Sequence, residues 1–284
     1  MSAPAADDGF AWCGELVRRE DPDRWLACLF IPAPARPAVH AIYAFSLEIA
    51  RAVAQVREPT LGLMRLQWWR DALAVGDGAA QANPVAAALL AAVARFDLPR
   101  EPLVELIEAR ESDLDEAPPA DVAALEAYAN ATSAVPMRLA AAILAPQTRA
   151  IEPAATRHAG VAYALVGLLR AYPWSAARGR LHVPRDLLAA HGISAQEALS
   201  GRAAPALLAA LADMRALARS HLAALPGALE AMPPGARPAC LPASLCEPYL
   251  RLMERRGYDP FTSRVERPQW RRQWTLLRAA RRWR

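Results

Sequence analysis

The most regular polar pattern in this chain contains too few acids for the metal chemistry that its spacing could support. Glu48, Arg51, Gln55 and Glu58 recur at helical spacing within residues 42–73. Carboxylates about four residues apart on one helix face could hold Mg²⁺. Because Glu48 and Arg51 are three residues apart, we expect an ion pair between them instead. Arg51 could alternatively bind a phosphate or carboxylate directly.

The other residue types that could carry chemistry do not form recognisable motifs. The sequence has no GxSxG or Walker-type glycine loop. Four cysteines without CxxC spacing are typical of reduced, buried thiols in a cytosolic protein. Trp68 and Trp69 are expected to pack in the core, and a ligand wall is the alternative. The five histidines show no metal-binding spacing: His40, His158, His182, His191 and His221.

Helices must position these side chains, because apolar residues make up 54% of the chain and no alternating strand pattern occurs. We therefore predict an all-α fold. Pro59 is expected to separate two helices within residues 42–73. Residues 154–170 are apolar nearly all round, which is typical of a helix buried on every side. Residues 9–30 predict two short helices, and further helices are predicted at 84–96, 102–114, 122–130, 139–144, 184–190, 204–225 and 242–256.

Length and composition favour one large helical domain over residues 1–265, followed by a basic tail over residues 266–284. The acidic N-terminus does not resemble a secretory signal or a transit peptide. No segment reaches eighteen uninterrupted, strongly apolar residues. We expect a cytoplasmic protein that reaches the inner membrane, if at all, as a peripheral protein.

The tail is rich in Trp and Arg, and two interpretations of it stay open. Basic residues with Trp and Leu on a short helix suit an anionic bilayer surface. The alternative is a terminal helix docked on the domain with solvated arginines. Nucleic-acid binding is not expected, because the basic charge is confined to one end and no recognition module accompanies it. The membrane-surface candidates are Trp270, Arg271, Arg272, Trp274 and Arg278.

Four segments, taken in order, resemble the squalene/phytoene synthase family. They are IYAF at 42–45, LQWWRDAL at 66–73, GVAYALVGLLR at 160–170 and GRLHVPRDL at 179–187. The last two, at their mutual spacing, are the most specific. The resemblance covers roughly residues 15–255. It implies a single-domain isoprenoid-synthase-like helical bundle around a central cavity. It also implies head-to-head condensation of two isoprenoid diphosphates, with Mg²⁺ held by two acidic clusters.

The positions that this resemblance assigns to the acidic clusters hold other residue types. The first cluster would fall at 50–51 and 54–55, and the second at 171, 174 and 175. None of the side chains there is a carboxylate, and Mg²⁺ requires hard oxygen ligands. We therefore predict no metal cofactor and no catalytic residue. The candidate pocket comprises these positions and their neighbours: Tyr43, Leu47, Glu48, Ala50, Arg51, Ala54, Gln55, Arg170, Ala171, Trp174 and Ser175.

A branch of the family with degenerate acids resembles this chain more closely. It includes a mitochondrial complex I assembly factor, whose GLMRxQxW stretch is similar to GLMRLQW at 62–68. This resemblance implies assembly or lipid handling without prenyl transfer. The implied partners are a prenyl or lipid ligand, a membrane surface and a protein client.

Two rival hypotheses remain. In the first, the chain is an active prenyl-diphosphate transferase that requires Mg²⁺ bound by acids from elsewhere, such as Glu48, Asp113 and Asp115, or that uses Arg51 and Arg170 without metal. In the second, it is a membrane-surface adaptor with a filled core and no cavity.

Overall fold

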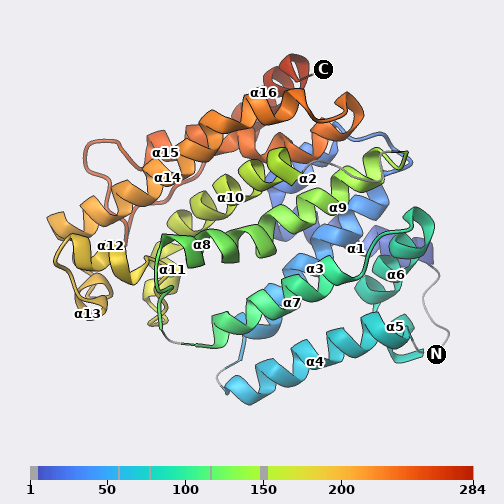
Figure 1. Cartoon of the computed structure of the whole chain (residues 1–284), viewed down its shortest axis with the longest axis horizontal. Helices are drawn as coiled ribbons and strands as arrows, with labels where there is room; N and C mark the ends of the chain where they lie inside the picture. Colours follow the sequence, from blue (N-terminus) through green and yellow to red (C-terminus); the bar gives the residue numbers. More distant parts are fainter. Residues whose placement is uncertain (1–5, 57, 77, 116, 148–152, 284) are drawn as a thin grey trace.

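The computed structural model describes residues 6–56, 58–76, 78–115, 117–147 and 153–283, and all regular structure in these ranges is helical. Figure 1 shows the helices packed in layers around α10 (Pro153–Arg170). The all-α prediction is confirmed. The helices bury their apolar faces against one another around shared cores.

Proline and capping residues set the boundaries of the first helices. Pro22 lies in the first turn of α2, and the side chain of Asp21 accepts a hydrogen bond from the backbone N–H of Arg24. Pro59 begins α4 directly after an extended Glu58, so the predicted break is confirmed. These helices are α1 (Ala6–Glu20), α2 (Pro22–Cys28), α3 (Arg36–Ala54) and α4 (Pro59–Val75).

The predicted ranges overlap helices of the structure, but the short helices at 78–82, 172–176 and 195–198 were not predicted, and the helix predicted at 139–144 begins at Val135. Two further ranges differ. The segment predicted as one helix at 242–256 is a 3₁₀ segment followed by a short α-helix, and the long helix after 204 continues beyond Pro226. Leu225 and Leu229 are buried on either side of that proline, so packing outweighs the lost hydrogen bond. The elements are α5 (Gly78–Ala82), α6 (Pro84–Phe96), α7 (Glu101–Glu111), η1 (Ser112–Leu114), α8 (Val122–Ala129), the π-turn η2 (Asn130–Ala134), α9 (Val135–Leu144), α10, α11 (Tyr172–Ala176), α12 (Arg185–Ala190), α13 (Ala195–Ala198), α14 (Pro205–Glu230), η3 (Pro234–Leu245), α15 (Cys246–Leu252) and α16 (Gln269–Arg282).

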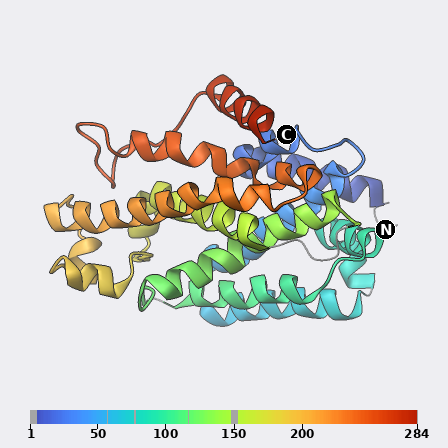
Figure 2. The same cartoon turned by 45° about the horizontal axis from the view of Figure 1, so that its top comes forward.

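Two clusters of buried apolar side chains make up the core. One is built mainly by α1, α3, α6, α7 and α9, and the other by α10, α14 and α15. Four partly buried side chains pack against both clusters: Trp25, Tyr163, Leu222 and Trp283. In both views α4 forms one edge of the molecule and α16 the opposite edge (Figures 1 and 2). Within the described ranges, no helix has the length and apolarity needed to cross a bilayer.

Candidate functional site: a charged cavity around Asp23

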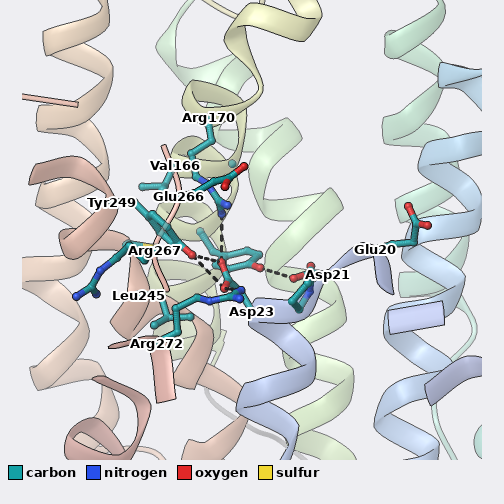
Figure 3. Close-up of a pocket in the computed structure, with 14 residues that line it drawn as sticks. Glu20, Asp21, Asp23, Val166, Arg170, Leu245, Tyr249, Glu266, Arg267 and Arg272 are labelled. Carbon is teal, nitrogen blue, oxygen red and sulfur yellow. Dashed lines mark hydrogen bonds and ion pairs between the residues drawn. The ribbon is translucent and has the colours of Figure 1, made fainter. Parts of the chain in front are cut away.

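A cavity of about 440 Å³ lies where the start of α2 meets the last turns of α10 and the first turns of α15 and α16. Asp23 stands at its centre and is only 3% exposed (Figure 3). Asp23 lies in the first turn of α2 and Arg170 in the last turn of α10, so each charge is at the helix end whose dipole favours it. The lining comprises Glu20, Asp21, Pro22, Asp23, Tyr163, Val166, Gly167, Arg170, Leu245, Cys246, Tyr249, Glu266, Arg267 and Arg272.

The carboxylate of Asp23 accepts hydrogen bonds from three other helices. The donors are Arg272 at 2.8 Å, Arg170 at 3.1 Å and the hydroxyl of Tyr249 at 2.8 Å. The guanidinium of Arg170 also lies over the ring of Tyr249, 4.0 Å from its centre. Burial opposes the charge of Arg170, but Tyr249 and Asp23 outweigh it and raise the pKa of the guanidinium. The carboxylate of Asp23 thus neutralises Arg170 and Arg272, two of the arginines that line the cavity.

Arg24 occupies the space between α3 and α10 beside this cavity. Its guanidinium lies 4.8 Å from the ring centre of Tyr43 on α3 and 5.1 Å from that of Tyr163 on α10. It donates a hydrogen bond to Ser133 Oγ at 3.1 Å. The hydroxyl of Tyr163 in turn donates to Asp21 at 2.8 Å. A side chain of α2 therefore separates the two helices that the resemblance would place on either side of a central cavity.

The protonation of three cavity side chains argues against their acting as nucleophiles. Burial raises the pKa of the Cys246 thiol and of the Tyr249 and Tyr163 hydroxyls. These groups stay protonated at neutral pH, when they can donate hydrogen bonds but cannot attack an electrophile. Arg267 points away from Asp23 (Figure 3). The protonated thiol and hydroxyls can therefore contact a polar group, but they cannot form a covalent bond to it as nucleophiles.

No group of three or more His, Cys, Asp or Glu residues is arranged to hold a metal ion in the part of the chain that the structure describes. Three of the four acids that line the cavity are bound to cations or hydroxyls: Asp23 as above, Asp21 to Tyr163, and Glu20 to Arg51 at 2.7 Å. Glu266, the fourth, would supply a single carboxylate. This donor set does not fit the Mg²⁺ that the family resemblance implies.

The positions predicted for the first acidic cluster lie on α3 and at its C-cap, outside the lining of the charged cavity. Glu48, Arg51 and Gln55 line a cavity of about 390 Å³ together with residues of α4. Arg51 contacts Glu48 at 3.2 Å, as the spacing predicted, and also Glu20 on α1. Around them, Tyr43 is fully buried, and Leu47, Ala50 and Ala54 are partly buried.

The second predicted stretch does not gather at one site. Arg170 lines the charged cavity, whereas Trp174 is 48% exposed and carries the guanidinium of Arg178 on its ring at 3.7 Å. Ser175 is buried, and its backbone carbonyl accepts a hydrogen bond from the N–H of Arg180 at 2.9 Å. Ala171 is partly buried. The structure therefore brings Arg170 to the cavity without the three positions that follow it.

The acids named for an alternative metal site lie on different cavities. Asp113 and Asp115 line a cavity of about 500 Å³ beside Arg180 and His182. Asp113 accepts hydrogen bonds from Arg110 at 2.9 Å and Tyr128 at 2.8 Å. Glu48 lines the cavity between α3 and α4 instead.

The C-terminal candidates form a helix that is docked on the domain. Trp270 and Trp274 are 63% and 55% exposed, and Arg271 and Arg278 are also exposed. Arg272, which the sequence grouped with them, points inward to Asp23.

Asp23 and Tyr249 were absent from the sequence-based candidates. The one local signal was the order Asp-Pro-Asp at a helix start, which marks an N-cap and a first-turn acid. Nothing local indicated that Asp23 would be buried among residues from three distant helices.

Comparisons with known proteins agree with this architecture. The model of the family described as squalene/phytoene synthase matches residues 17–278. NADH dehydrogenase (ubiquinone) complex I, assembly factor 6, of Rattus norvegicus is 31% identical, over 92% of this chain and 78% of that protein. Presqualene diphosphate synthase of Rhodopseudomonas palustris is 30% identical, over 70% of this chain and 71% of that protein.

Solved structures show the same fold. A dehydrosqualene synthase superposes with a TM-score of 0.83 at 17% identity, over 98% of this chain and 97% of that one. A squalene synthase of Alicyclobacillus acidocaldarius superposes with a TM-score of 0.76 at 23% identity, over 90% of this chain and 97% of that one. With its family match, its relatives and its helical fold in agreement, the chain belongs to the squalene/phytoene synthase family.

Proposed function

We propose that this chain is a non-catalytic member of the family that acts in the assembly of a respiratory NADH dehydrogenase. The observation that carries the proposal is the chemistry at the positions of the two acidic clusters. They hold Ala50, Arg51, Ala54 and Gln55 in one stretch and alanine, tryptophan and serine in the other. Arg51 is held there by Glu48 and Glu20 and supplies no oxygen ligand where the reaction needs a bound cation.

The charged cavity supports the same conclusion. Separation of a diphosphate from its carbon chain requires cations free to neutralise the growing negative charge. Here Arg170 and Arg272 are bound to Asp23. A second anion would have to compete with a buried, hydrogen-bonded carboxylate for them, which is costly.

The proposed role in assembly is taken from the named role of a relative. The rat protein that is 31% identical is named as a complex I assembly factor, and its match covers 92% of this chain. We extend that role to this chain, with a protein client, a peripheral position at the inner membrane and a prenyl or lipid ligand as its expected partners. No Mg²⁺ is expected as a cofactor.

An active prenyl-diphosphate transferase is the second candidate, because the Rhodopseudomonas palustris relative is named as presqualene diphosphate synthase. The placement of Glu48 and Asp113 on separate cavities speaks against an alternative metal site.

Two measurements test the proposal together. Purified chain is incubated with farnesyl or geranylgeranyl diphosphate and Mg²⁺, with the Rhodopseudomonas palustris synthase as positive control. In parallel, the gene is deleted in its own host, and assembled NADH dehydrogenase is measured in membranes by native gel and activity. We expect no prenyl product and a loss of the assembled complex that the wild-type gene restores. Mg²⁺-dependent product formation, or unchanged assembly, would contradict the proposal.

A further inference from the structure

Helix α16 has two faces with different environments. On its inner face Leu276 is fully buried and Arg272 reaches Asp23 at 2.8 Å. At its end, the carbonyl oxygen of Trp283 accepts a hydrogen bond from Arg237 at 3.0 Å. These contacts hold the rotation of the helix, so the side chains that point outward are determined by the fold. Trp270 and Trp274 both belong to that outer face.

The outer face combines exposed aromatic rings with arginines that form no ion pair with any described residue. Residues 269–282 include five arginines and no acid. Four of these, Arg271, Arg278, Arg281 and Arg282, are exposed. Among nearby acids, Glu247 is already bound to Arg219 and Arg251, and Glu266 lies before the helix at the mouth of the charged cavity. The basic charge of α16 therefore faces solvent largely without a neutralising partner on the helix itself.

An apolar groove lies directly beside these arginines. It has a volume of about 520 Å³ and lies between α14, η3 and α16. Leu222, Leu225 and Ala243 line it together with Trp274, Arg278 and Arg282. Glu247 also lines it, but its carboxylate is bound to Arg219 and Arg251. An apolar channel with cations at its edge matches the shape of a phospholipid, whose phosphate adjoins its acyl chains.

We propose that the outer face of α16 and this groove dock on the surface of an anionic phospholipid bilayer. Trp270 and Trp274 would lie at the level of the headgroups, where amphipathic rings are most stable. The exposed arginines would bind lipid phosphates, and the groove would receive an acyl chain. Charge complementarity selects this partner, because a neutral surface would leave the arginines without counter-charges. This inference rests on the peripheral membrane position proposed above. Vesicle binding tests it without a protein client, so its failure would leave the assembly role to the deletion experiment.

Sedimentation with vesicles of phosphatidylcholine, with and without phosphatidylglycerol, tests the proposal directly. The wild-type chain is expected to bind only the anionic vesicles, and less at high salt. The double variant Arg278→Gln/Arg282→Gln is expected to bind them about 25-fold more weakly, at about a fivefold loss for each arginine. The double variant Trp270→Ser/Trp274→Ser is expected to lose quenching of tryptophan fluorescence by brominated lipids.

Matched controls separate docking from general effects of charge and stability. Arg185→Gln/Arg202→Gln removes the same charge from exposed positions near α12 and α13, and Trp174→Ser removes an exposed ring elsewhere. These variants are expected to bind like the wild type. All of the altered side chains are exposed, so thermal unfolding should be unchanged. Equal binding to neutral vesicles, equal losses in the controls, or binding to a soluble acidic protein without vesicle binding would each overturn the proposal.

Discussion

The buried carboxylate of Asp23 neutralises two arginines that would otherwise be free to bind a charged ligand. Its side chain is nearly inaccessible, yet it is bound by two guanidinium groups and one hydroxyl. A buried charge of this kind is tolerated only when its partners are complete. The residue therefore stabilises the fold through its partners, and loss of its charge leaves two arginines uncompensated.

The first prediction concerns this charge. Asp23→Asn is expected to lower the free energy of unfolding by about 3 kcal/mol, because it breaks a buried ion pair and leaves its cations unpaired. Urea denaturation monitored by circular dichroism measures the change. Asp71→Asn, at an exposed position, serves as the matched control and should shift stability by less than about 0.5 kcal/mol. A similar effect of the two substitutions would contradict the assigned role.

His40 provides a second prediction at the same scale. Burial, assisted by Arg36, lowers the pKa of His40 from about 6.5 to about 4, and its Nε2 has no hydrogen-bond partner among the described residues. Between these two values the unfolded chain binds a proton that the folded chain does not. Stability is therefore complete above pH 6.5 and falls as the pH drops toward 4, by up to about 3 kcal/mol.

Chemical denaturation across this pH range, compared between the wild type and His40→Gln, measures the contribution. The variant lacks the titrating group, so its stability should fall less steeply between pH 6.5 and 4. Parallel curves for the two proteins would show that another group controls the acid sensitivity.

At the scale of elements, α10 uses two glycines for opposite reasons. A Cβ on Gly160 would lie 2.2 Å from the Cα of Ala134, so the helix approaches the π-turn η2 backbone to backbone. A Cβ on Gly167 would meet nothing within 4 Å, because that position faces the charged cavity. The same residue type therefore permits close packing at one end and leaves open space at the other.

The third prediction uses this contrast within one helix. Gly160→Ala is expected to destabilise the protein by about 2 kcal/mol or more through overpacking against backbone. Gly167→Ala is expected to stabilise it by about 0.5 to 1 kcal/mol, since alanine favours the helix and no clash opposes it. Urea denaturation of both variants gives the two signs. If both substitutions destabilise equally, the cavity beside Gly167 is smaller than described.

Local sequence signals predicted the elements better than the site. Pro59 marked a helix start, and the spacing of Glu48 and Arg51 predicted their ion pair. The cluster around Asp23 could not be predicted in this way. Its partners Arg170, Tyr249 and Arg272 lie 147, 226 and 249 residues away, and no periodicity relates side chains across such distances. The helix boundaries predicted at Pro226 and Pro242 were wrong, because tertiary packing outweighed local propensity at both prolines.

At the scale of the whole molecule, the two core clusters are joined by shared side chains, which favours unfolding as one unit. The four cysteines are all buried and divide between the clusters: Cys13, Cys28 and Cys240 in one, and Cys246 in the other. Burial raises the pKa of each thiol, to about 12 for Cys13 and Cys240. Native thiols should therefore react very slowly.

The fourth prediction follows for labelling with a thiol reagent at pH 8. All four cysteines are expected to react at one common rate that is controlled by global opening, because no cluster exposes its thiols alone. Mass spectrometry of the labelled peptides measures each rate, and labelling in urea provides the fully reactive reference. Earlier labelling of Cys246 than of the other three would show that the C-terminal cluster opens separately.

The contact between Asp23 and Arg272 also has a consequence for biosynthesis. The two residues are 249 positions apart, and ribosomes add about 5 to 20 residues per second. On the order of 12 to 50 s therefore pass between the synthesis of Asp23 and that of Arg272, the last of its counter-charges to be translated. Until then the first turn of α2 holds an acid without its full set of partners. Helix α16 thus completes the ion pairs of Asp23. A nascent chain that lacks α16 should therefore be bound by chaperones or cleaved by proteases more readily.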